Sequence, residues 1–265
     1  MTITLTGVTS NGEKISKEFS KDMDYLFFNS KDVCSIDLTP LGECPNLEAV
    51  NLYSNKLEKI DLTPLRRCKK LKKLNLNRNS LKDIDLTPLS QCENLKVLEL
   101  ASNQFMSINL NPLSNCNQLT HLILDGNKLT MVNLKPLSKC KELLWLVLEN
   151  NKLVHIDLEP LMQCKNLIHI DLSFNQLTTI DLQPLSIMEN LEEIYLWDNN
   201  LGPIDISPLR GCKKLKHLYI KKDHPIEWKD TILNEKELPE HLRKSWVKSI
   251  RAAREKYLRE RKVDS

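Results

Sequence analysis

The sequence lacks any stretch long enough to cross a membrane. Its longest uninterrupted apolar run extends from Leu143 to Leu148, whereas about 20 apolar residues are needed to span a bilayer. Residues 1–8 contain no basic segment followed by an apolar one, so they do not resemble a secretory signal. We therefore expect an intracellular, cytoplasmic protein that is neither secreted nor inserted into a membrane.

A charge excess and recognisable chemical motifs are missing too. The 265 residues carry 38 Lys and Arg against 35 Asp and Glu, a net charge of +3, which gives no overall attraction to nucleic acid. The sequence has no phosphate-binding loop, no metal-ligand cluster and no nucleophile and base at a recognisable spacing. We expect no catalytic residue, no metal and no cofactor.

The eight cysteines do not form the pattern of a disulfide framework. Seven of them occupy one position of a 24-residue period, which predicts a ladder of small buried side chains. Free thiols of this kind are typical of a reducing compartment. Cys34 lies off the ladder and is interpreted as structural. The seven are Cys44, Cys68, Cys92, Cys116, Cys140, Cys164 and Cys212.

A 24-residue unit close to I-D-L-x-P-L-x-x-C-x-x-L-x-x-L-x-L-x-x-N-x-L-x-x repeats without insertion. Its segment L-x-x-L-x-L-x-x-N-x-L resembles the leucine-rich-repeat family over roughly 200 residues. The resemblance implies an α/β fold: a right-handed, horseshoe-shaped solenoid with a parallel concave β-sheet. The copies begin at Ile36, Ile60, Ile84, Ile108, Val132, Ile156, Ile180 and Ile204.

The L-x-L alternation independently predicts one short, half-buried strand in each repeat. With a degenerate first copy, we expect nine parallel strands and a sheet about 40 Å long. The repeated asparagine sits where the chain leaves the strand, so its buried amide is expected to hydrogen-bond neighbouring turns. The ladder comprises Asn55, Asn79, Asn103, Asn127, Asn151, Asn175 and Asn199, with Lys31 and Asp223 at its two ends.

On the return path, Thr39-Pro40 and Thr63-Pro64 place a hydroxyl before a proline, which predicts threonine-capped 3₁₀ or helical turns. A recurring aspartate precedes these turns. Cation binding is one interpretation of the row, and solvated or turn-capping carboxylates are the favoured one. The row contains Asp37, Asp61, Asp85, Asp157, Asp181 and Asp205.

Three segments follow from these patterns. Residues 1–35 form an N-terminal β-hairpin cap, with a turn at Asn11-Gly12, plus the degenerate repeat. Residues 36–223 hold eight 24-residue repeats, and residues 224–265 form a C-terminal cap with a basic amphipathic helix. We expect this helix to fold back over the last repeat from Pro239 onward. Its apolar stripe comprises Leu242, Trp246, Ile250, Ala253 and Tyr257.

Residues between the core leucines of each strand point to the concave face, called the sheet face below. This face is rich in aromatic residues, which are typical of binding hot spots, with acidic residues around them. It therefore predicts a protein partner with basic residues around an apolar anchor. Stacking that only stabilises the sheet is the alternative. The predicted partner-binding residues are Ile123, Trp145, Val147, Glu149, His169, Asp171, Tyr195, Trp197 and Tyr219.

Three histidines of the sheet face suggest a metal site, but alternate repeats lie about 10 Å apart, too far to share one ion. They are His121, His169 and His217. His169 beside Asp171 is interpreted as a pair on the binding surface, since no nucleophile accompanies it to make a catalytic dyad.

Two further functions remain open. Leucine-rich-repeat proteins include regulators of small GTPases and phosphatases, so the resemblance also allows a regulatory subunit of such an enzyme. The C-terminal helix allows binding of RNA, an anionic membrane or an acidic protein, against the alternative of a solvated capping face. Its basic patch comprises Arg243, Lys244, Lys248, Arg251 and Arg254.

Overall fold

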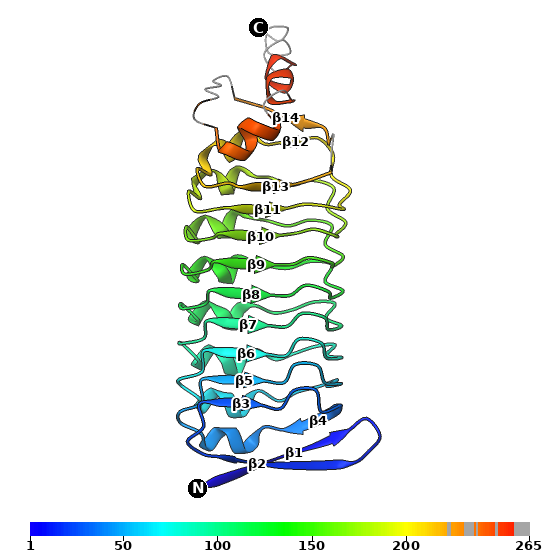
Figure 1. Ribbon diagram of the computed structural model, residues 1–265, viewed down its shortest axis with the longest axis vertical. Helices are drawn as coiled ribbons and strands as arrows, with labels where there is room; N and C mark the ends of the chain where they lie inside the picture. Colours follow the sequence, from blue (N-terminus) through cyan, green and yellow to red (C-terminus); the bar gives the residue numbers. More distant parts are fainter. Residues whose placement is uncertain (222–223, 231–235, 237, 247–248, 257–265) are drawn as a thin grey trace.

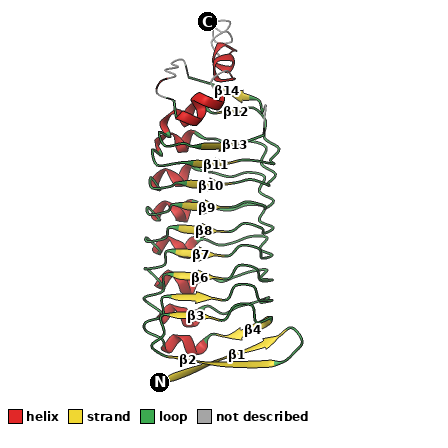
Figure 2. Cartoon of the chain, viewed as in Figure 1, coloured by secondary structure: helices red, strands yellow, loops and turns green. Residues whose placement is uncertain are grey.

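The protein is a column of stacked turns with one strand and one short helix in most turns (Figure 1). This computed structural model describes residues 1–221, 224–230, 236, 238–246 and 249–256. The strands line one side of the column and the 3₁₀ helices lie behind them (Figure 2). The predicted α/β solenoid with a parallel sheet is confirmed.

The main sheet contains the nine parallel strands that the repeat predicts, in chain order. Neighbours pair without a shift, as where Leu98 faces Leu122, 24 residues later, because every repeat has the same length. The strands are β3 (Tyr25–Phe27), β5 (Ala49–Asn51), β6 (Lys73–Asn75), β7 (Val97–Glu99), β8 (His121–Ile123), β9 (Trp145–Val147), β10 (His169–Asp171), β11 (Glu193–Tyr195) and β13 (His217–Tyr219).

The return path of each repeat is a 3₁₀ helix with proline in its first turn, as predicted. The φ angle of proline is fixed near the helical value, and proline lacks only an N–H that would have no partner in the first turn of a helix. The helices are η1 (Thr39–Glu43), η2 (Thr63–Arg67), η3 (Thr87–Gln91), η4 (Asn111–Asn115), η5 (Lys135–Lys139), η6 (Glu159–Gln163), η7 (Gln183–Ile187) and η8 (Ser207–Gly211).

The predicted threonine cap of these helices is wrong. Thr39 already lies inside η1, because Leu38 is the N-cap residue and its carbonyl accepts the Leu41 N–H. The recurring aspartate does the capping instead: Oδ1 of Asp37 accepts the N–H of Thr39 at 2.9 Å, and Asp61 and the later repeats make the same bond. The aspartate row therefore consists of turn-capping residues.

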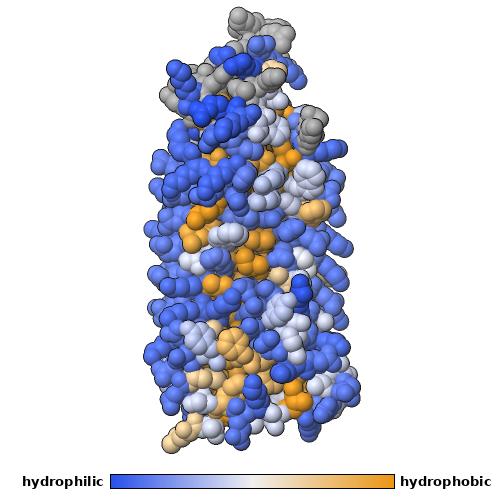
Figure 3. Space-filling view, viewed as in Figure 1, coloured by the Kyte–Doolittle hydropathy of each residue, from blue (hydrophilic) through white to orange (hydrophobic). Residues whose placement is uncertain are grey.

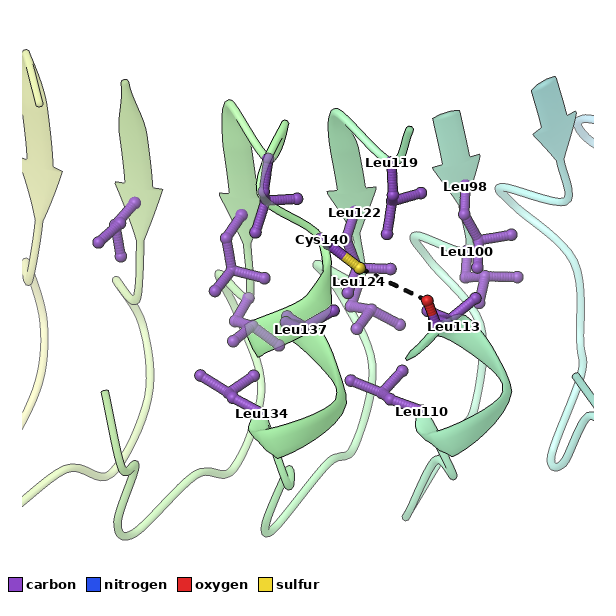
Figure 4. Packing of buried hydrophobic residues seen from close by; sticks show 14 of the residues in the cluster. Leu98, Leu100, Leu110, Leu113, Leu119, Leu122, Leu124, Leu134, Leu137 and Cys140 are labelled. Atoms are coloured by element: carbon purple, nitrogen blue, oxygen red, sulfur yellow. Dashed lines mark hydrogen bonds between the residues drawn. The ribbon is translucent and has the colours of Figure 1, made fainter. Parts of the chain in front are cut away.

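Leucines from strands and helices meet in one continuous core (Figure 4). The cysteine ladder is buried in it, and Cys140 Sγ lies 3.5 Å from the Leu113 carbonyl of the preceding repeat. Burial raises the pKa of the Cys140 thiol to about 12. All eight cysteines are free, and Met188 takes the ladder position in the one repeat without cysteine.

The asparagine ladder ties neighbouring turns together, as predicted. The amide nitrogen of Asn127 donates to Leu124 O in its own turn at 3.0 Å and to Leu100 O in the preceding turn at 3.1 Å. Its Oδ1 accepts the Phe105 N–H at 3.2 Å. One side chain thus provides hydrogen bonds to backbone groups that are not paired within the sheet. Asn127 itself is 8% exposed. Asp223, at the predicted end of the ladder, lies outside the described residues.

The N-terminal end is closed by a sheet of three strands. The predicted hairpin is present as β1 (Thr2–Thr9) and β2 (Lys14–Ser20), with Gly12 in the left-handed region at φ 87°. A third strand, β4 (Val33–Asp37), pairs antiparallel with the other edge of β1. The repeat pattern did not predict β4, because its pairing is set by the cap rather than by a neighbouring repeat.

The predicted C-terminal helix is described in two parts, before and after residues 247–248. A two-stranded parallel pair, β12 (Ile204–Asp205) with β14 (Ile226–Glu227), was not predicted. A π-helical turn, η10 (Leu242–Trp246), lies across the end of the column, and the α-helical residues 249–256 extend beyond it (Figure 1). Among all the residues that the structure describes, no helix is both long and apolar enough to cross a membrane.

The predicted apolar stripe is confirmed where it is described. Leu242 and Ile250 are fully buried, while Trp246 and Ala253 pack against the core from partly buried positions. Tyr257 of the stripe and Lys248 of the basic patch lie outside the described residues.

Replacing Asn127 with alanine is expected to lower the free energy of unfolding by about 2–4 kcal/mol, because two buried carbonyls and one N–H lose their partner. Asn166→Ala is the matched control, since that exposed amide makes only long contacts of 3.3–3.4 Å. Urea unfolding of both variants measures the difference. Equal stability of the two would contradict a structural role for the ladder.

Candidate binding face

The sheet face is formed by the side chains on either side of each buried strand leucine. On β9, Leu146 points into the core while Trp145 and Val147 flank it at exposed and half-buried positions. The surface is mostly hydrophilic, with apolar side chains gathered along the middle of the sheet (Figure 3). The period-2 pattern thus predicts which residues form this face.

Aromatic side chains of successive strands stack on each other across the C-terminal half of this face. Trp145 lies between His121 and His169, with ring centroids 6.0 and 4.3 Å away and planes within 17°. Tyr195 continues the row at 5.1 Å from His169 and 4.5 Å from Tyr219. We call this row, extended through His217 and His241, the ring ladder.

The ring ladder joins the repeats to the C-terminal cap. His217 lies 5.2 Å from Tyr219 on β13, and His241, immediately before η10, meets His217 edge-on at 5.9 Å. Such pairs add about 0.5–1.5 kcal/mol beyond their buried area. His241 was not predicted as part of the face. It lies after the last repeat, so the 24-residue spacing does not indicate that it contacts β13.

His169 does not pair with Asp171, contrary to the sequence interpretation. Its Nδ1 lies 2.8 Å from Glu193 Oε2 on the next strand, and the residue is only 7% exposed beneath its ring neighbours. The Tyr195 hydroxyl donates to the same carboxylate oxygen at 3.5 Å. Burial, followed by the charge of Glu193, raises the pKa of Tyr195 to about 12. Asp171 points elsewhere because its Oδ1 accepts the Ser173 N–H at 2.9 Å.

The other predicted contact residues lie on five neighbouring strands, β8 to β11 and β13, or two residues beyond them, as Glu149 and Trp197 do. Trp145, Trp197 and Tyr219 are 37%, 46% and 39% exposed, whereas Ile123, Val147 and Tyr195 are half-buried. Phe174 beside them is 44% exposed. Its backbone is left-handed at φ 53°, a conformation that disfavours a bulky residue.

Three carboxylates lie among these side chains: Asp125, Glu149 and Asp171. The sequence instead predicted an acidic rim around an apolar centre. Burial, followed by the negative charge of Asp171, raises the pKa of Glu149 above its usual range. Burial likewise raises the pKa of Asp125, to which the Asp171 charge adds. We call these three residues the acidic cluster.

The basic patch of the C-terminal cap is only partly described. Arg243, Lys244 and Arg251 are exposed, and Arg254 is half-buried. Lys244 forms an ion pair with Glu240 one helical turn earlier, so part of its charge is compensated within the cap.

Metal-ligand geometry is absent from the described part of the chain, where no three His, Cys, Asp or Glu side chains could hold an ion. The three histidines of the face instead contact aromatic rings in the ring ladder.

Comparison with known sequences identifies the class of protein. The sequence model of the leucine rich repeat family matches residues 45–105, 69–129 and 141–201, which together cover more than half of the chain. The chain belongs to the leucine-rich-repeat family, whose members are generally non-catalytic binding scaffolds. No curated protein matches the sequence.

Solved structures of the same fold come from bacteria and plants. A leucine-rich-repeat protein of Leptospira interrogans is 28% identical with a TM-score of 0.68, over 79% of this chain and 50% of its own. Internalin C2 of Listeria monocytogenes is 27% identical with a TM-score of 0.56, over 69% and 74%. This chain thus spans half the length of the Leptospira chain.

A plant peptide hormone receptor, RGFR1, solved in complex with RGF2, is 30% identical with a TM-score of 0.60. The match covers 67% of this chain and 28% of the receptor chain. Leucine-rich-repeat folds are thus commonly protein-interaction modules.

Glu149→Gln is expected to stabilise the protein at pH 7 by about 0.5 kcal/mol. The folded state raises the pKa of Glu149, so its contribution to stability is full below the unfolded pKa and lost as the pH rises through the folded one. The gain should therefore shrink at pH 4. Thermal unfolding at both pH values measures it, with exposed Glu93→Gln as control. A gain independent of pH would contradict this account.

Proposed function

We propose that the chain is a non-catalytic interaction scaffold that binds a protein partner on the C-terminal half of the sheet face. The observation that carries the proposal is the exposure of Trp145, Trp197 and Tyr219 on the C-terminal half of one sheet face. Solvent-exposed rings on a rigid surface are unfavourable unless a partner covers them, and Trp and Tyr are the residues enriched at hot spots.

The ring ladder supports this proposal by fixing the shape of the surface. Trp145 stacks on His169, which Glu193 holds in turn. A ring held in place loses little conformational entropy when a partner covers it. Stacking and binding are therefore compatible roles for Trp145 and Tyr219, whereas Trp197, exposed and outside the ring ladder, is the clearer candidate for a partner contact.

The proposal places the protein in a reducing, intracellular compartment, supported by eight free thiols. A regulatory role toward an enzyme such as a small GTPase or phosphatase is a special case that the identity of the partner decides. Exposed Arg243 and Lys244 keep binding of nucleic acid or membrane through the basic cap as the second candidate. Strong loss of binding with salt distinguishes it from an apolar contact.

Affinity capture from source-cell lysate, followed by measurement of Kd for the captured partner, tests the proposal. Trp197→Ala with Tyr219→Ala is expected to weaken binding by about 30-fold or more. These positions are preferred to Trp145 and Tyr195, which cover buried His169.

The matched control is Tyr25→Ala with Phe27→Ala, which removes two rings, each 55% exposed, at the other end of the same face. It is expected to leave the Kd unchanged. Capture that survives the first pair but fails with the control would place the contact on the N-terminal half. Capture that survives both pairs and fails only when Arg243 and Lys244 are replaced would favour the basic cap.

A further inference from the structure

The acidic cluster lies between the exposed rings of the sheet face. Asp125 and Glu149 occupy equivalent positions just after β8 and β9, and Asp171 ends β10. In the strand register Asp171 faces Val147 on one side and Tyr195 on the other. Three carboxylates therefore lie on three successive repeats, among aromatic and aliphatic side chains.

No cation of the protein neutralises this cluster within the described residues. The other carboxylates of the face do have partners: Glu99 pairs with Lys73 at 2.6 Å, and Glu193 with His169 at 2.8 Å. The three carboxylates of the cluster take part in no such pair. Burial raises the pKa values of Asp125 and Glu149, and the negative charge of Asp171 raises both further.

A second observation at the same place is the hydroxyl of Ser173, which is buried and has no hydrogen-bond partner. The residue is 3% exposed. It follows Glu149 in the row of equivalent positions, and its N–H is held by the Asp171 carboxylate. An unpaired buried hydroxyl is unfavourable, so Ser173 would gain from a hydrogen-bond donor placed beside Asp171.

Aromatic rings flank this polar centre. Trp197 takes the position equivalent to Ser173 in the next repeat, and Phe174 follows Ser173 directly. Both rings are nearly half exposed. Aromatic faces attract cations, and a guanidinium group also stacks flat upon them.

We propose that the acidic cluster and Ser173 bind one arginine side chain of the protein partner, beside the rings of Trp197 and Phe174. This rests on the proposed function and adds the chemistry that the partner brings. Arginine fits better than lysine because its planar group offers five donors in fixed directions and is more weakly hydrated. A metal ion fits less well, since the described carboxylates do not converge as a ligand set.

A displayed library of random peptides, selected on the intact protein, supplies the probe. The best binder is synthesised with a fluorophore in three forms: with its arginine, with citrulline and with lysine at that position. Citrulline keeps the shape but loses the charge, so we expect about 30-fold weaker binding or more. We expect lysine to weaken binding by about 10-fold, since it loses the paired donors.

Variants of the protein test the cluster from the other side. Glu149→Gln with Asp171→Asn removes two charges but keeps an oxygen to hold the Ser173 N–H, and is expected to weaken the arginine peptide by about 30-fold. Ser173→Ala is expected to weaken it several-fold without lowering the melting temperature, because the free hydroxyl has no partner to lose. Glu93→Gln, exposed and outside the face, is the control.

The outcomes separate this inference from the proposed function. Peptides that require Trp197 but tolerate citrulline and the double variant would overturn the arginine site and leave the binding face intact. Peptides that bind Trp197→Ala and Tyr219→Ala unchanged would overturn the binding face. The peptide selection can also be run on the variant with Glu149→Gln and Asp171→Asn. If arginine peptides are enriched no more strongly on the unmodified protein than on this variant, the arginine site is overturned.

Discussion

The structure depends on the hydrogen bonds that each asparagine makes to the preceding turn. Three-residue strands pair only briefly, so many backbone groups at the strand ends would otherwise be buried without partners. Asn127 satisfies two carbonyls and one N–H across a fixed distance in sequence. An insertion inside a repeat would misplace these atoms. The strict 24-residue period is therefore a consequence of this bond as much as of leucine packing.

Strict periodicity also decides what stands on the surface. Every strand leucine enters the core in the same register, so equivalent outward positions form straight rows along the sheet. An aromatic residue at one position therefore meets its neighbour in the adjacent repeat, as Trp145 meets His169. The same geometry that stacks the rings brings the carboxylates of Asp125 and Glu149 into one cluster. Attraction and repulsion on this face both originate in the repeat.

Periodicity likewise explains how much could be predicted from the sequence. The nine strands, the buried cysteines and the outward rows follow from spacing alone, because repeats with a neighbour on each side have equivalent environments. The misses lie where that equivalence ends. β4 and β14 pair only at the caps, and His241 meets β13 from outside the repeats. His169 pairs with Glu193 rather than Asp171 because a side chain chooses among neighbours in space, which spacing cannot rank.

Groups that destabilise the free protein are concentrated in one part of the sheet face, and this bears on the role of the face. If stability alone determined this face, apolar side chains or paired charges would be expected at the centre of the sheet. Lys73 on β6 and Glu99 on β7 form such a pair. In the next three repeats the chain instead retains unpaired carboxylates, a buried hydroxyl without a partner and a phenylalanine in a left-handed turn. Each is unfavourable in the free protein. Their concentration beside exposed tryptophans argues that the favourable interactions at this place are made with a partner.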